Sequence, residues 1–156
     1  MAKRPRVISP RDRKGKQVDK IRINRAVQDE MTAEARRRAP LEACGLLGGS
    51  DGHVTSCFVL TNMDAAEEHF SMDPREQFAA IKEMRKAGEG MLAIWHSHPA
   101  TPARLSDEDL RLAYTPDVAY VIVSLADAAG PATAGYRIDN GEITKLEIEI
   151  VEVPCE

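Results

Sequence analysis

The chain has 156 residues, with 21 basic and 25 acidic side chains, four His and three Cys. That length suits one globular domain and leaves little room for a cofactor domain beside a substrate domain. The net charge of −4 gives no overall attraction to nucleic acid or to an acidic membrane. No apolar run approaches the roughly 20 residues of a membrane-spanning helix, and Met1–Arg13 lacks the apolar stretch of a secretory signal. We therefore expect a cytoplasmic protein without a membrane or nucleic-acid partner.

The N-terminal segment differs in composition from the rest of the chain. Residues 1–20 hold eight Lys or Arg against two Asp, with few large apolar residues. Such a segment buries too little surface to offset its ordering entropy, so we expect residues 1–17 to form a disordered basic tail and residues 18–156 to form the domain. The tail could be an arm for nucleic acid or an acidic partner. A solvated leader is the favoured interpretation, because basic runs alone are weak motifs.

The first elements of the domain are predicted from apolar spacing and turn residues. A short strand is expected over 21–23, and Asn24 is placed to cap a helix over 25–38. An apolar run over 41–48 leads into a Gly-rich turn, and a second run covers 54–60. Together these two runs predict a β-hairpin.

Helices and strands alternate through the rest of the domain. Pro74 suits the first turn of a helix over 74–87, with Phe78, Ile81 and Met84 spaced to face inward. Further strands are expected over 91–95, 134–138 and 143–151, and over the most apolar run, 118–125, at the centre of the sheet. This alternation predicts an α/β fold with a mixed β-sheet flanked by helices.

The pattern that carries chemistry is His96-x-His98, followed by Ser106 and Asp109. At a strand end, residues i and i+2 project to the same side, so both imidazoles can reach one ion. Asp109 lies one turn beyond Ser106, a good cap for a helix over 107–114, so the two share a face. Two imidazoles and a carboxylate make a zinc site with one position left for water, whose pKa zinc lowers toward roughly 7. The pattern predicts one catalytic zinc per chain.

Proton transfer at such a site needs a further group, and Glu42 is the leading candidate. It stands at the start of the apolar run 41–48, where a carboxylate is otherwise hard to explain. If that strand neighbours the His96 strand, Glu42 can act as general base and then pass the proton to a leaving amine. Ser106 could stabilise the oxyanion of a tetrahedral intermediate, although it would also be needed as a helix cap.

The remaining conspicuous residues receive structural interpretations. The three Cys are widely spaced and odd in number, which fits neither a disulfide framework nor a structural zinc site. Cys44 is expected to be a buried packing residue rather than a nucleophile. Trp95 points away from the His96 side and is expected in the core or as an interface anchor. His53 is expected to be solvent-exposed, and His69 is expected in a solvated loop, with a place in the substrate groove as the alternative.

The sequence His96-Ser97-His98-Pro99, with Ser106, Asp109 and the upstream Glu42, resembles the JAMM signature of the MPN+ metalloprotease family. The resemblance runs from about Val18 to Val151 and implies a fold similar to that of cytidine deaminases. It implies that the two His and Asp109 are zinc ligands, that Glu42 is the general acid/base, and that Ser106 supports the oxyanion. No residue of the motif is missing.

Segments outside the signature indicate which subgroup of the family the chain resembles. The run 42–49, and Asn62 followed by 70–74, are similar to small bacterial members that act on ubiquitin-like sulfur-carrier proteins. The implied function is hydrolysis of a peptide or isopeptide bond at the C-terminus of a ubiquitin-like or sulfur-carrier protein. The chain leaves little room for insertions that grip ubiquitin, so a flexible carrier tail is the expected substrate. Small members often pair, which makes a homodimer a state to test.

Three other functions are alternatives to a protease. A zinc deaminase needs His-x-Glu and Pro-Cys-x-x-Cys, which this chain lacks. A non-catalytic MPN-type interaction module would be expected to lack a metal ligand. A DNA-repair-associated JAMM-like protein usually has Ser-Gly after the Pro, where this chain has Ala100-Thr101. The sequence leaves open the carrier, the leaving group, the pathway, the oligomeric state and the role of the basic tail.

Overall fold

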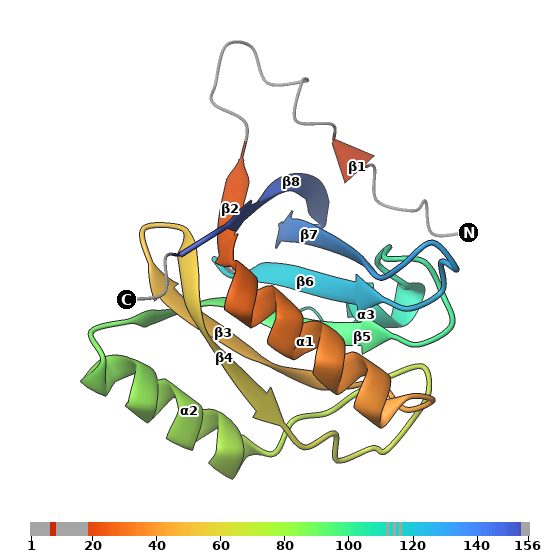
Figure 1. Ribbon diagram of the computed structural model, residues 1–156, viewed down its shortest axis with the longest axis horizontal. Coiled ribbons are helices and arrows are strands. Elements are labelled where there is room, and N and C mark those ends of the chain that lie inside the picture. Colours follow the sequence, from red (N-terminus) through yellow and green to blue (C-terminus); the bar gives the residue numbers. More distant parts are fainter. Residues whose placement is uncertain (1–6, 9–18, 112, 114, 116, 154–156) are drawn as a thin grey trace.

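The computed structural model describes residues 7–8, 19–111, 113, 115 and 117–153 (Figure 1). The strands are β1 (Val7–Ile8), β2 (Lys20–Asn24), β3 (Cys44–Ser50), β4 (His53–Leu60), β5 (Gly90–His98), β6 (Ala119–Ser124), β7 (Ala132–Asp139) and β8 (Glu142–Val151). The helices are α1 (Arg25–Arg38), α2 (Pro74–Lys86) and α3 (Asp107–Arg111). Of the predicted tail, only β1 is described, and it pairs with β8. The rest of 1–17, and positions 112 and 114 of the predicted third helix, lie outside the described residues.

The strands form one mixed sheet in the order β1-β8-β2-β4-β3-β5-β6-β7. The sheet contains parallel pairs such as β2–β4 and β5–β6 and antiparallel pairs such as β3–β4 and β3–β5. This confirms the predicted α/β class with a mixed sheet. Strands β7 and β8 pair as a hairpin, and because β8 also pairs with the distant strand β2 the sheet closes on itself, which the apolar pattern alone did not indicate. Every residue of β6 is buried, as expected for a strand with neighbours on both sides.

Two helices cover different faces of the sheet (Figure 1). Helix α1 buries Val27, Met31 and Ala35, spaced four residues apart, in a core that also contains Trp95 of β5. Helix α2 packs Met84 into a second core with Leu46 and Ile94. Because neighbouring residues on β3 and β5 point to opposite faces, each strand contributes to both cores. Strands β3 and β5 are therefore packed against apolar residues on both faces.

Two expectations about helix residues were wrong. Phe78 of α2 is 69% exposed rather than facing inward. Ala80 and Met84, four residues apart, form the buried stripe, and a residue two positions before Ala80 does not share that face. Asn24 does not cap α1 with its side chain. Its Oδ1 instead accepts a hydrogen bond from Nε2 of His53 at 2.5 Å, which leaves His53 half-buried rather than exposed.

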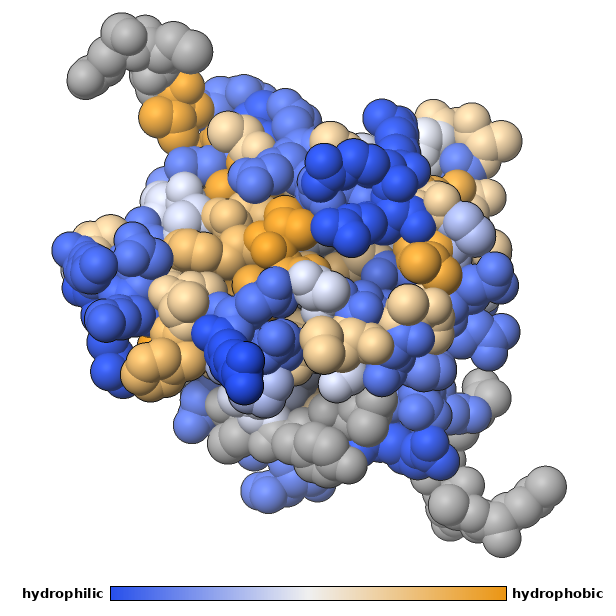
Figure 2. Space-filling model, turned by 90° about the horizontal axis from the view of Figure 1, so that it is seen from below, coloured by the Kyte–Doolittle hydropathy of each residue, from blue (hydrophilic) through white to orange (hydrophobic). Residues whose placement is uncertain are grey.

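The surface beside α2 carries an apolar groove. Seen from that side, apolar side chains gather in a band between hydrophilic ones (Figure 2). A hollow of about 390 Å³ there is lined by Phe58, Val59 and Ala79, among others. No helix within the described part of the chain is both long and apolar enough to cross a membrane.

Candidate metal centre

The end of β5 delivers two imidazoles to one side of the sheet. His96 pairs with Cys44 of β3 and with Ile122 of β6, so its backbone is fixed between two neighbouring strands. His98 follows two residues later and pairs with Ser124. Their side chains are 1% and 5% exposed. The expected same-side projection of the pair is therefore present in a buried setting.

Helix α3 supplies the carboxylate through a reciprocal cap. The backbone N–H of Asp109 donates to Oγ of Ser106 at 3.0 Å, and the N–H of Ser106 donates to Oδ2 of Asp109 at 2.9 Å. This arrangement is a capping box with Asp in the place usually taken by Glu or Gln. The Ser106 oxygen accepts in the cap, so its own O–H remains available as a donor. Capping and oxyanion support, which looked like competing uses of one hydroxyl, are thus compatible.

Ligand atoms of three side chains form a small triangle, with the two carboxylate oxygens of Asp109 at one corner. Nε2 of His96 lies 3.1 Å from Nε2 of His98 and 3.1 Å from Oδ1 of Asp109, and Nε2 of His98 lies 3.1 Å from Oδ2 of Asp109. Ligand atoms of a tetrahedral ion bound at about 2.0–2.1 Å are about 3.3 Å apart, so the triangle is close to the size that an ion requires. With Glu42 included, one ligand atom from each of the four residues lies within 4.8 Å of the others. The residues fit a metal ion.

Glu42 lies two residues before β3, the strand that neighbours β5. The predicted strand begins three residues later than expected, at Cys44. The segment is nevertheless held against β5, because the N–H of Ala43 donates to Oγ of Ser97 at 2.8 Å and the N–H of Ser97 donates to the Ala43 carbonyl at 2.9 Å. Glu42 is 2% exposed, and its Oε1 has no hydrogen-bond partner among the described residues. A buried carboxylate oxygen without a partner is costly unless something else binds it.

Burial and charge set the protonation of the two carboxylates in opposite directions. Burial raises the pKa of Glu42 to about 8, and the charges of Asp109 and Glu68 add to the shift while His98 opposes it. Burial also acts to raise the pKa of Asp109, but its hydrogen bonds to His96 and His98 outweigh burial and hold that pKa well below its ordinary value. The site therefore pairs an ionised carboxylate with a proton-holding one.

The two imidazoles also differ. Burial lowers the pKa of His96, which favours the neutral ring that a metal requires. Burial also lowers that of His98, but its bonds to Asp109 and to the Pro102 carbonyl outweigh this and raise its pKa overall. Nδ1 of His98 donates to that carbonyl at 2.8 Å, so Nε2 of His98 is directed toward His96 and Asp109. Such a bond to the far ring nitrogen is the usual way in which a ligand imidazole is oriented.

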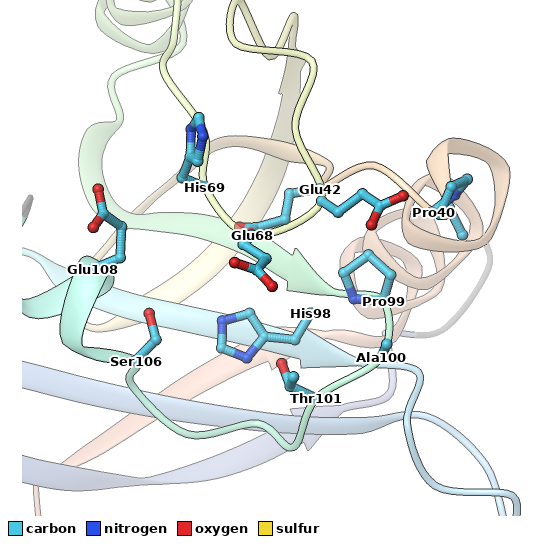
Figure 3. Close-up of a pocket in the computed structure, with 12 residues that line it drawn as sticks. Pro40, Glu42, Glu68, His69, His98, Pro99, Ala100, Thr101, Ser106 and Glu108 are labelled. Atoms are coloured by element: carbon cyan, nitrogen blue, oxygen red, sulfur yellow. The ribbon is translucent and has the colours of Figure 1, made fainter.

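A cavity of about 690 Å³ opens beside these residues. In Figure 3, His98 lies between Ser106 and Thr101, and the Glu68 carboxylate points toward it from the opposite wall. Among the described residues that line the cavity, four are Glu and none is Lys or Arg. The cavity thus has a negative wall that attracts cations, including a metal ion.

Several residues of the site were not found from the pattern. Pro102 acts through a backbone carbonyl, which carries no sequence signal. The Phe70 ring stacks on the His96 ring, with centroids 4.8 Å apart, yet only its place in the family resemblance distinguished it. Ser97 could have been noticed, because strand alternation turns it away from its two His neighbours and toward the Glu42 segment.

The structural interpretations of other residues are largely confirmed. Cys44 is fully buried, and burial raises the pKa of its thiol to about 12, so it is a packing residue. Trp95 is fully buried in the core on the opposite side of β5. His69 is exposed, as expected, and also lines the cavity.

The sequence family described as prokaryotic homologs of the JAB domain matches residues 24–137. A CysO-cysteine peptidase of Mycobacterium tuberculosis is 37% identical over 128 residues, which cover 78% of this chain and 85% of that protein. A desampylase of Haloferax volcanii is 32% identical over 105 residues, which cover 62% and 75% of the two chains. The matched region contains all five predicted site residues.

Solved structures give the same picture of the fold. The solution structure of a protein from Desulfitobacterium hafniense superposes with a TM-score of 0.79 and 47% identity, covering 85% of this chain and 94% of that one. The shared fold therefore spans nearly all of the described domain.

Proposed function

The chain belongs to the family of prokaryotic homologs of the JAB domain and is a JAMM-type hydrolase, and from this we propose that it is a zinc-dependent peptidase. Its substrate is a peptide or isopeptide bond at the C-terminus of a ubiquitin-like or sulfur-carrier protein. The observation that carries the proposal is the buried group of Glu42, His96, His98 and Asp109, whose ligand atoms lie within 4.8 Å of one another beside an open cavity.

Zinc is the metal that this donor set favours. Two imidazole nitrogens and one carboxylate oxygen are typical of catalytic zinc, whereas magnesium and calcium prefer sites made of oxygen ligands. His96, His98 and Asp109 would hold the ion. When bound, zinc would polarise the scissile carbonyl and lower the pKa of a water molecule toward roughly 7.

Glu42 is the proton carrier of the proposed reaction. Its burial beside the ligand set places a carboxylate where the attacking water must lose a proton. The pKa of Glu42 falls when a divalent cation lies beside it, which makes the ionised form available as a base. The proton then passes to the leaving nitrogen, so the C–N bond breaks to give a carboxylate on the carrier and a free amine.

Ser106 is the proposed support for the oxyanion. Its oxygen accepts from the Asp109 N–H, so its O–H can donate to negative charge that develops on the carbonyl oxygen. Ser106 also lines the cavity, where a substrate carbonyl would enter. The cavity is open enough to admit an extended chain end, and this supports a flexible carrier tail as substrate. The names of the relatives, with the resemblance to small bacterial members, support the same substrate class.

The proposal is tested by measuring zinc content and cleavage together. Zinc-loaded protein is incubated with a sulfur-carrier fusion that continues beyond its C-terminal glycine, and the product masses are recorded. We expect one zinc per chain and cleavage at the carrier terminus, with Asp109→Asn losing both. Stoichiometric zinc without cleavage of any carrier fusion would favour an interaction module, and absence of bound zinc would exclude the proposed mechanism.

A further inference from the structure

The segment 62–72, which we call the flap, connects β4 to α2 and covers the metal centre. Glu67, Glu68 and His69 of the flap line the cavity, and Phe70 stacks on the His96 ring. Most flap residues are exposed, while Phe70 and Met72 pack against the second core. The exposed part of the flap must therefore be held mainly by polar contacts.

One side chain makes four of those contacts. Nδ2 of Asn62 donates to the carbonyl of His69 at 3.1 Å and to the carbonyl of Glu42 at 3.2 Å. Oδ1 of Asn62 accepts from the N–H of Asp64 and from the N–H of Ser71, both at 3.1 Å. A single amide thus joins the two ends of the flap to each other and to the residue that carries the buried carboxylate.

The flap also reaches Glu42 from the other side. The N–H of Glu42 donates to the carbonyl of Ala66 at 2.9 Å. The Glu42 backbone is therefore tied to the flap twice, by its N–H to Ala66 and by its carbonyl to Asn62. A bridge between Asn62 and Met72 closes the base of the flap next to these bonds.

Only an amide of this length satisfies all four partners. Two carbonyls need donors and two N–H groups need acceptors, and Asn carries both functions on one short side chain. Asp would keep the acceptors and lose the donors, and Ala would lose all four. Thr61, the neighbouring residue, has no part in this network, because its N–H and hydroxyl donate to Glu76 of α2.

We propose that Asn62 is a positioning residue for the hydrolysis, which holds Glu42 and the flap in register on the two sides of the metal centre. It acts through Glu42, whose backbone it fixes, and through His69 and Phe70, which the flap places against the cavity and the His96 ring. The proposal rests on the proposed function for its kinetic consequence. Misplacement of a reacting group by about 1 Å can cost about 100-fold in rate.

The kinetic test compares Asn62→Ala with Thr61→Val. Each variant removes hydrogen bonds of one side chain at adjacent positions, but only the first removes bonds to Glu42 and the flap. We expect Asn62→Ala to lower kcat about 10- to 100-fold while KM changes less than about threefold. Thr61→Val is expected to retain the wild-type kcat. Equal kcat values for Asn62→Ala and wild type, measured on the same fusion, would overturn the proposal.

A second measurement does not depend on activity. Amide hydrogen exchange is followed in peptides that cover 41–44 and 62–72, and in peptides of α1 as a reference. For Asn62→Ala we expect exchange of Glu42, Asp64 and Ser71 to quicken about tenfold, with the α1 peptides unchanged. Exchange that quickens equally everywhere would assign Asn62 a general structural role instead.

The variant Asn62→Asp separates the two halves of the network. Its oxygens still accept from Asp64 and Ser71, so the flap amides should stay protected, but the carbonyls of Glu42 and His69 lose their donor. We expect kcat to fall with the flap still closed, and a wild-type kcat would show that the bond to Glu42 is irrelevant. If wild-type protein cleaves no carrier fusion, the proposed function fails, and the exchange data alone decide whether Asn62 holds Glu42.

Discussion

At the C-terminal end of strand β5, the two sides are equally buried and chemically opposite. On one side Trp95 is fully buried among apolar side chains, and its Nε1–H donates to the Phe58 carbonyl at 3.4 Å. On the other side His96 is 1% exposed and lies among titratable groups, with its Nδ1 unpaired within the described chain. Burial on the first side stabilises the fold. Burial on the second side costs free energy and shifts pKa values, as is typical of functional sites.

The same backbone therefore serves stability and chemistry by strand alternation alone. A change on the Trp95 side should unfold the protein without a specific effect on the reaction. A change of His96 or His98 should abolish the reaction while stability is kept. Four measurements test this division between stability and chemistry.

The largest effect is expected from Glu42→Gln. The amide keeps the size of the side chain but cannot accept and release the proton, so kcat should fall by about 10²- to 10⁴-fold. Zinc content and the urea midpoint should stay at or above wild-type values, because a desolvated carboxyl group has been removed. Steady-state kinetics with zinc analysis measure both. Loss of zinc in this variant would make Glu42 a ligand rather than a proton carrier.

Trp95→Ala should produce the largest loss of stability. A fully buried Trp replaced by Ala leaves a cavity, and such changes cost about 3–5 kcal/mol of the free energy of unfolding. Urea denaturation reports the change. Among molecules that remain folded, the zinc content per chain should match wild type. A variant that unfolds normally but fails to bind zinc would contradict the separation of the two sides.

The pH dependence of metal-free protein tests the cost on the Glu42 side. The pKa of Glu42 is about 8 in the folded chain, against 4.5 ordinarily, so the folded state holds a proton that the unfolded state releases. This stabilisation is complete below about 4.5 and is lost as pH rises through about 8. The urea midpoint with chelator present should fall over this range, and fall less in Glu42→Gln. Parallel curves for the two proteins would show that Glu42 titrates normally.

The smallest effect is expected at Phe78, which is 69% exposed on α2. Phe78→Ala should change the free energy of unfolding by less than about 0.5 kcal/mol. Met84→Ala, on the buried face of the same helix, should cost about 2–5 kcal/mol. Equal losses for the two variants would restore the inward orientation that the sequence spacing suggested.

The sequence predicted those parts of the site that obey local periodicity. His96 and His98 lie on the same side because side chains of a strand alternate between its two faces. Ser106 contacts Asp109 because residues three apart at the start of a helix lie next to each other. The mixed α/β class followed from the order of elements in the same way. Closure of the sheet by the pairing of β8 with the distant strand β2 depends on accumulated twist, which no short pattern records.

What could not be predicted lies in backbone contacts between distant segments. The Pro102 carbonyl orients His98, and the amide of Asn62 joins Glu42 to the flap, but neither contact follows a repeat. Phe78 was misplaced because an apolar residue at helical spacing was assumed to face the core. The choice of the buried face was in fact made by the packing of Ala80 and Met84.

One experiment tests directly whether a zinc-dependent hydrolytic site is formed by Glu42, His96, His98 and Asp109. A carrier fusion is treated with zinc-loaded protein in water enriched in oxygen-18, and the products are weighed intact. We expect cleavage at the carrier terminus with one heavy oxygen atom in the new carboxylate. This cleavage should be lost when zinc is chelated and restored when zinc is added back. A fusion that stays intact beside protein carrying one zinc per chain would contradict it.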